Sequence, residues 1–150
     1  MQVCDLMQRD VVTLQASDTL DLADDIMRLA RIRHLPVVEG NRVVGVLSQR
    51  DLFRAALSSM LQLGRTAERE FLAKVPVRAA MTPSAFTIGS AASMRSAVHL
   101  MLERKIGCLP VVDDGELVGL VSETDCLRHL EHVLDIVHEK GLLVELAAAS

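Results

Sequence analysis

The chain has 150 residues and a formal net charge of −4, and 50% of its residues are hydrophobic but only 2% aromatic. The acidic balance and the absence of Trp and Tyr argue against a nucleic-acid surface, which needs a basic stripe and rings for stacking. Three scattered cysteines without a C-x-x-C motif, no signal-peptide pattern and no run of 18 apolar residues predict a cytoplasmic protein with no direct membrane insertion.

One segment of the chain occurs twice, 74 positions apart. Residues 35–51 read LPVVEGNRVVGVLSQRD, and residues 109–125 read LPVVDDGELVGLVSETD. When residues 3–54 (copy one) are paired with residues 77–128 (copy two), 15 of the 52 pairs are identical. This self-similarity predicts an internal duplication, in which each small copy needs the other to cover its apolar face.

Both copies are predicted to follow the order strand, helix, strand, strand, helix. In copy one, residues 11–14 are rich in β-formers, and a helix with three- and four-residue apolar spacing begins near Ser17-Asp18-Thr19. Residues 35–38 and 43–47 are expected to form a hairpin, because the turn between them holds the Gly and Asn that tolerate positive φ. A further helix begins at Ser48.

In copy two, the corresponding predicted strand covers residues 85–88, and the predicted hairpin covers 109–112 and 117–121. Short lead-in segments, Val3–Met7 and Val77–Met81, open the two copies. The fold class is therefore α/β (α+β). We expect residues 1–63 to form the first repeat with its following helix, 64–76 a linker, 77–132 the second repeat, and 133–150 a C-terminal helix and tail.

The motif most suited to binding chemistry is Ser48-x-x-Asp51, which recurs as Ser122-x-x-Asp125. A serine followed three residues later by an acid is a capping box that starts a helix, and this structural role explains a single copy fully. Two copies, each behind a hydrophobic strand with a glycine at the same place, also fit ligand binding. A carboxylate in the first turn can accept two ribose hydroxyls, and the helix start can meet a phosphate.

In combination these motifs resemble the cystathionine-β-synthase (CBS) domain, and two in tandem resemble a Bateman module. The resemblance covers about residues 1–132. It implies two β-α-β-β-α repeats packed about a pseudo-twofold axis, with two clefts for adenosine-type ligands such as AMP, ADP, ATP or S-adenosylmethionine. It also implies a regulatory, signal-sensing role, a homodimer, and an effector protein that receives the signal.

Carried over by position, the resemblance assigns residues to each cleft. The first cleft would place Asp51 on the ribose hydroxyls, with phosphate-binding groups and a base-enclosing wall from Arg33, His34, Val46, Ser48, Arg50, Phe86, Thr87 and Ile106. The second cleft would use Val12, Thr13, Ile32, Leu120, Ser122, Thr124 and Asp125. Each residue also has a structural interpretation: the arginines as solvated charges, His34 as a helix cap, Phe86 as core.

The two copies differ at the phosphate positions. Gly107 and Cys108 replace Arg33 and His34, and Thr124 replaces Arg50. A charge-assisted hydrogen bond is worth about 1.5–3 kcal/mol, and the second cleft is expected to have none. We therefore expect the first cleft to bind an anionic nucleotide, and the second to be weaker, empty, or occupied by a less charged adenosyl ligand.

Other functions have weaker support. His129, His132 and His138 with Cys126 and Asp135 suggest a metal, but the polar side of an amphipathic helix explains them, so no metal or other cofactor is predicted. No P-loop, G-x-G-x-x-G, H-E-x-x-H or G-x-S-x-G motif is present, and no catalytic residue is assigned. The alternatives are a dimerisation or scaffold module that binds nothing, and the cytosolic regulatory part of a larger enzyme or transporter.

Overall fold

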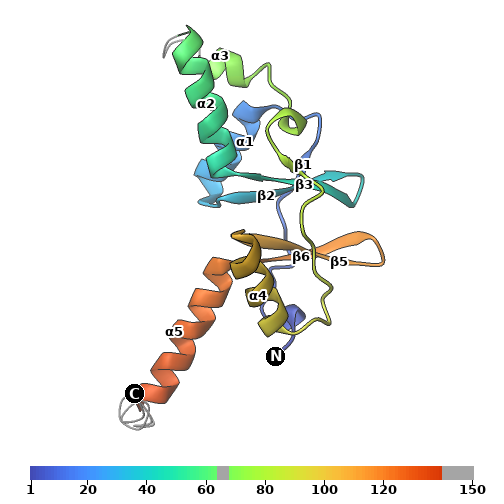
Figure 1. The fold of residues 1–150 in the computed structure, drawn as a ribbon, viewed down its shortest axis with the longest axis vertical. Helices are drawn as coiled ribbons and strands as arrows, with labels where there is room; N and C mark the ends of the chain where they lie inside the picture. The colour runs from blue at the N-terminus through green and yellow to red at the C-terminus, as the bar shows by residue number, and fades with distance from the viewer. Residues whose placement is uncertain (64–67, 140–150) are drawn as a thin grey trace.

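The computed structural model of the chain describes residues 1–63 and 68–139 (Figure 1). Its helices and strands are, in chain order, β1 (Leu14–Gln15), α1 (Leu20–Ala30), β2 (His34–Glu39), β3 (Arg42–Ser48), α2 (Gln49–Leu63), α3 (Glu68–Leu72), β4 (Thr82–Pro83), α4 (Met94–Arg104), β5 (Cys108–Asp113), β6 (Glu116–Ser122) and α5 (Glu123–Glu139). Both lead-in segments begin with a 3₁₀ turn. The predicted mixed α and β fold is confirmed. Residues 64–67 of the predicted linker lie outside the described residues, and Glu68–Leu72 of the same linker form α3. Of the predicted C-terminal helix and tail, residues 133–139 belong to α5 and residues 140–150 lie outside the described residues.

The predicted order of elements is confirmed in both copies, but the predicted position of the first strand in copy two is wrong. Strand β1 is shorter than predicted, and residues 85–88 form no strand in the described part of the chain. Only an isolated bridge joins Ile88 to Val111 there. The strand that precedes α4 is instead β4, and it pairs with β3 of copy one.

Helices α1 and α4 have the same construction because their apolar residues recur every three or four positions. Leu20, Ala23 and Met27 are buried in α1, and their counterparts in α4 are buried in the same way. Each helix ends at a basic residue in the left-handed conformation, Arg31 (φ 54°) and Lys105 (φ 54°). The backbone N–H of this residue caps the helix, and the chain then turns directly into β2 or β5.

The predicted hairpins are confirmed. Strand β2 pairs antiparallel with β3, and β5 pairs antiparallel with β6 in the same register. Gly40 takes φ +64° in the first turn, whereas Asp114 and Gly115 both take positive φ in the second. The two turns meet, because the N–H of Leu117 donates to the carbonyl of Asn41 at 3.0 Å.

Each lead-in segment crosses to the other copy. The N–H of Val3 donates to the carbonyl of Ala92 at 2.9 Å, and the N–H of Val77 donates to the carbonyl of Asp18 at 2.7 Å. Val77 lies 74 positions after Val3, and Ala92 lies 74 positions after Asp18. The two hydrogen bonds are therefore the same contact made once in each direction between the copies. Residues that follow the segments behave likewise: Gln8 bridges Leu120 of β6, and Thr82 pairs with Val46 of β3. This reciprocity fits the pseudo-twofold relationship that the family resemblance implies.

Two hydrophobic cores result from the exchange. One core gathers Leu14, Leu20, Leu35 and Leu47 of copy one around Val77 of copy two. The other contains the following residues of both copies: Val3, Met7, Met94, Ala97, Met101, Leu109, Val111 and Val121. Every residue named in the two cores is at most 8% exposed, so neither core is complete without the partner copy.

The two sheets lie side by side in the middle of the molecule, with α1–α3 beyond one sheet and α4 and α5 beyond the other (Figure 1). Strands β3 and β6 are in contact across this central plane. The clefts described below lie where the two copies meet. None of the helices within residues 1–63 and 68–139 combines the length and apolarity needed to span a membrane.

Candidate functional site

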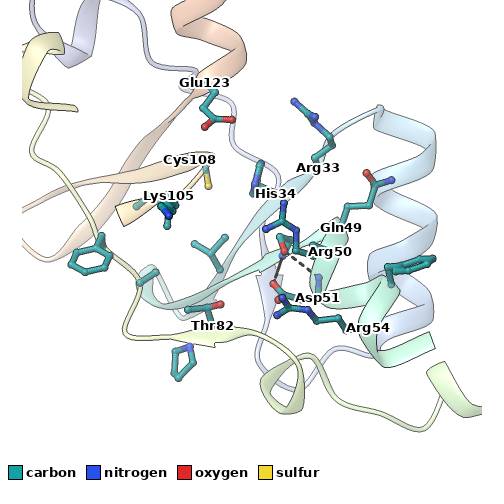
Figure 2. A pocket seen from close by; sticks show the side chains of 18 of the residues that line it. Arg33, His34, Gln49, Arg50, Asp51, Arg54, Thr82, Lys105, Cys108 and Glu123 are labelled. Carbon is teal, nitrogen blue, oxygen red and sulfur yellow. Dashed lines mark hydrogen bonds between the residues drawn. The ribbon is translucent and has the colours of Figure 1, made fainter. Parts of the chain in front are cut away.

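A cleft of about 830 Å³ opens between the copies at the start of α2 (Figure 2). Copy one contributes the end of β3, the first turn of α2 and the turn into β2, and copy two contributes residues 82–86 and the turn into β5. The residues that line this first cleft are Arg33, His34, Val46, Ser48, Gln49, Arg50, Asp51, Phe53, Arg54, Thr82, Pro83, Ser84, Ala85, Phe86, Lys105, Ile106, Gly107, Cys108 and Glu123.

Asp51 lies in the first turn of α2, where the capping box predicted from the sequence is formed. Its Oδ2 accepts hydrogen bonds from the N–H of Ser48 at 2.8 Å and from the Ser48 hydroxyl at 2.7 Å. The Ser48 hydroxyl in turn accepts from the N–H of Asp51 at 3.2 Å. No described residue donates a hydrogen bond to Oδ1, so this oxygen is available to a molecule in the cleft.

Basic side chains outnumber acidic ones around the first cleft, although the chain as a whole is acidic. Arg33, Arg50, Arg54 and Lys105 line it, against the carboxylates Asp51 and Glu123. Figure 2 shows Arg50 and Arg54 beside Asp51, with Lys105 across the cleft. This local excess of positive charge suits an anionic ligand.

Two of these basic residues were not predicted. Arg54 follows Asp51 by three positions and therefore lies on the same side of α2. Lys105 belongs to copy two, and its 74-residue counterpart Arg31 lines the second cleft. The internal repeat could have predicted this placement. Arg31, which ends α1 of copy one, lies at the cleft of the copy-two capping box, and Lys105, which ends α4 of copy two, lies at the cleft of the copy-one capping box.

His34 is half-buried against the backbone of copy two. A Cβ added to Gly107 would lie 2.8 Å from its Cε1, so a larger residue at position 107 would have to move this ring aside. Burial and the neighbouring Arg33 lower the pKa of His34 below 6.5, although Glu123 opposes the shift. At neutral pH His34 is therefore an uncharged hydrogen-bonding group rather than a cation.

The neighbouring thiol of Cys108 is also unreactive. Cys108 is 5% exposed, and its burial raises the pKa of the thiol to about 12. The thiolate is the nucleophilic form of cysteine, and it is scarcely populated at neutral pH. Cys108 is therefore part of the wall and not a nucleophile.

An apolar wall faces the charged side of the first cleft. Val46, Phe86 and Ile106 line it, where the family resemblance placed them. The Phe86 ring is 45% exposed, and the guanidinium carbon of Arg104 lies 4.9 Å from its centroid. Thr87 does not line the cleft, because residues 82–86 form this part of the wall and Thr87 faces solvent.

A second, smaller cleft of about 150 Å³ lies at the equivalent place near the start of α5. Its lining consists of Gln8, Asp10, Val11, Val12, Arg31, Ile32, Arg33, His34, Leu120, Ser122 and Thr124. Five of the seven residues predicted for this cleft are therefore present, and Thr13 and Asp125 are not among its lining residues.

The expectation that the second cleft lacks positive charge is wrong. Arg31 and Arg33 both line it, and Nη2 of Arg33 donates to Oγ1 of Thr124 at 3.5 Å. The family resemblance had assigned Arg33 and His34 to the first cleft alone. In the structure both residues line both clefts, because the turn from α1 into β2 lies between them.

The carboxylates of the two capping boxes differ sharply in their surroundings. Asp125 is 6% exposed, and its Oδ2 accepts from the N–H and hydroxyl of Ser122 at 2.9 and 2.6 Å. Its Oδ1 accepts from Nε2 of Gln8 at 2.8 Å and lies 3.6 Å from Nη1 of Arg128. Both oxygens of Asp125 are thus satisfied within the chain, unlike those of Asp51.

No group of three or more His, Cys, Asp or Glu side chains is arranged to hold a metal ion in the described ranges 1–63 and 68–139. His132 and His138 are exposed along α5, which fits the polar side of an amphipathic helix. The site therefore offers charge, hydrogen-bonding groups and an apolar wall, which are features of a small-molecule site.

Comparison with known proteins agrees with this arrangement. The family model "CBS domain" matches residues 3–58 and 77–132. Inosine-5'-monophosphate dehydrogenase of Korarchaeum cryptofilum is 33% identical over 143 residues, which cover 95% of this chain but only 27% of that enzyme.

Two solved structures share the whole arrangement. The crystal structure of AcuB from Vibrio cholerae superposes with a TM-score of 0.76 at 31% identity, covering 93% of this chain and 96% of that one. The crystal structure of CBSX2 in complex with AMP superposes with a TM-score of 0.72 at 26% identity, covering 88% and 97%. The two matched segments are the two copies found in the sequence, and the chain belongs to the CBS domain family as a tandem pair of CBS domains.

Proposed function

We propose that the chain is a regulatory module that binds an anionic adenine nucleotide in the first cleft and passes its bound state to a partner protein. The observation that carries this proposal is the open Oδ1 of Asp51, at the edge of an 830 Å³ cleft bordered by four basic side chains. Cavities of roughly 300–1,000 Å³ are typical of small-molecule sites. The CBSX2 structure, solved with AMP, supports the choice of ligand class.

Each part of a nucleotide has a matching group in the cleft. The ribose hydroxyls would donate to Oδ1 of Asp51, since an ionised carboxylate only accepts hydrogen bonds. The adenine ring would lie against Val46, Phe86 and Ile106, and the phosphate would meet Arg50, Arg33, Arg54 or Lys105. Neutral His34 would supply a further hydrogen bond to the ligand.

Helix α2 supplies a route for the signal. Its first turn carries Asp51, and Phe53, two positions on, lines the cleft while 67% exposed. The last helix, α5, presents its own apolar residues: Leu127 (65% exposed), Leu130 (50%), Val133 (38%), Leu134 (47%) and Ile136 (37%). Apolar helix faces of this extent favour a homodimer or docking on an effector.

The competing function is a dimerisation or scaffold module with an idle cleft. Thermal unfolding with AMP, ADP, ATP, adenosine and S-adenosylmethionine separates the two, because a ligand at 100 times its Kd adds about 2.7 kcal/mol to stability. We expect the nucleotides to raise the melting temperature more than adenosine does. No shift with any of the five compounds would favour the scaffold.

A matched pair of variants then tests the role of charge. Arg50→Gln removes a basic group from the cleft, whereas Arg95→Gln removes one from the exposed side of α4, away from the cleft. In calorimetric titrations with ATP, Arg50→Gln should weaken binding about tenfold, and Arg95→Gln should leave it unchanged. Equal effects would show that net charge, and not the cleft, attracts the nucleotide.

A further inference from the structure

The two clefts differ at the residue that follows each lead-in segment. Gln8 follows the first segment, and backbone hydrogen bonds hold it to β6: each of Gln8 and Leu120 donates its N–H to the carbonyl of the other at 2.9 Å. This pair of backbone hydrogen bonds holds Gln8 so that its side chain lies beside the capping box of copy two. Its Nε2 donates to Oδ1 of Asp125 at 2.8 Å.

Thr82 takes the equivalent place in copy two, 74 positions later. It pairs with Val46 of β3 just as Gln8 pairs with Leu120 of β6. Its side chain has one hydroxyl and no amide arm, and no hydrogen bond joins it to Asp51 among the described residues. The backbone geometry is thus shared, and the length and chemistry of this one side chain differ.

We propose that Gln8 is a built-in plug of the second cleft: its amide occupies the carboxylate oxygen that a ribose hydroxyl would otherwise use. This inference rests on the proposed function, because it assumes that Asp51 is the ribose-binding group of the first cleft. Because Asp125 is 6% exposed, a ribose hydroxyl could reach its Oδ1 only by displacing the Gln8 amide, which donates to that oxygen at 2.8 Å. The second cleft is accordingly small, and Asp125 lies outside its lining.

The rest of the second cleft is equipped for the same class of ligand. Arg31 and Arg33 supply positive charge, and Val12, Ile32 and Leu120 supply an apolar wall. Lack of charge would therefore not keep a nucleotide out of the second cleft. Removal of the Gln8 amide is expected to convert this cleft into a second nucleotide site.

Two substitutions, each of which gives one copy the residue of the other, test the plug. Gln8→Thr gives the second cleft the residue of the first, and Thr82→Gln does the reverse at an exposed position. By calorimetric titration with ATP, the wild type should bind one nucleotide per chain and Gln8→Thr should bind two. Thr82→Gln should weaken the single site about tenfold or more, because the new amide competes for Asp51.

The outcomes separate the plug from the proposed function. One site in both the wild type and a folded Gln8→Thr, or two sites in the wild type, would overturn the plug while the nucleotide function stands. No binding by the wild type would overturn the nucleotide function, and a site gained in Gln8→Thr would still support the plug. If Gln8→Thr failed to fold, unchanged affinity of Thr82→Gln would refute the plug, and weakened affinity would support it.

Discussion

Gly45 and Met81 lie so close that a Cβ added to Gly45 would be 2.7 Å from the Met81 sulfur and 2.7 Å from the Thr82 carbonyl oxygen. The same closeness recurs between Gly119 and Met7, with 2.6 Å to the sulfur. These glycines sit where each lead-in segment crosses onto the sheet of the other copy. They explain why a glycine stands in the same place in both repeats.

Gly45→Ala should therefore lower the free energy of unfolding by roughly 1–3 kcal/mol, the usual cost of overpacking against atoms that cannot all move aside. Urea denaturation followed by circular dichroism measures this directly. Gly89→Ala is the matched control, because the nearest atom to its added Cβ would be Asp113 Oδ1 at 3.7 Å. Indistinguishable stabilities of the two variants would refute the close crossing.

Ser48→Ala should destabilise the fold by about 1 kcal/mol, because it removes the hydroxyl that caps α2 and donates to Asp51. Ser122→Ala should have a similar effect through α5, since the bonds are equivalent. Ser17→Ala, at an exposed serine ahead of α1, is the control. The same denaturation experiment applies, and a cost for Ser17→Ala as large as for the two caps would contradict this role.

His34 makes stability depend on pH in a defined direction. Because its pKa in the folded protein is below 6.5, the unfolded chain takes up the proton more readily. The free energy of unfolding should therefore fall as the pH drops below 6.5 towards the folded-state pKa, and this contribution should be fully present above pH 6.5. The wild type should lose more stability than His34→Gln between pH 7.5 and pH 5.5 in thermal unfolding. Parallel losses would contradict the lowered pKa.

Cys108 should resist thiol reagents in the folded protein. Burial raises its pKa to about 12 and blocks access, whereas Cys4 is only half-buried. At pH 8, a chromogenic disulfide reagent should modify Cys4 first, then the half-buried Cys126, whose pKa is raised by burial, and Cys108 only after unfolding. Cys4→Ser provides the control, since it should remove the fast phase. Rapid modification of Cys108 in the native protein would show that the cleft wall is open.

The sequence alone predicted the features that depend on local pattern. The capping boxes, the hairpin turns around Gly40 and Gly115, and the buried stripe of α1 each follow from residue type and spacing over a few positions. The exchange of lead-in segments could not be predicted this way, because the bond from Val3 to Ala92 joins residues far apart in the chain.

The site was predicted less completely for the same reason. The family resemblance assigned Asp51 and Phe86 to the first cleft, and both residues line it. The resemblance also assigned Arg33 to that cleft alone, whereas Arg33 lines both clefts. The bond between Gln8 and Asp125 spans 117 positions, and no spacing rule reveals it. Side chains that reach across the pseudo-twofold axis had to be seen in three dimensions.

The most direct test of the account compares Asp51→Asn with Asp125→Asn by calorimetric titration with ATP. Asparagine keeps the shape and capping ability of the side chain but removes its charge. Asp51→Asn should weaken ATP binding at least about tenfold, because the charge-assisted hydrogen bonds are lost. Asp125→Asn should leave the affinity of the first cleft for ATP unchanged. Equal losses in the two variants, or no loss in Asp51→Asn, would contradict the claim that one open carboxylate selects the occupied cleft.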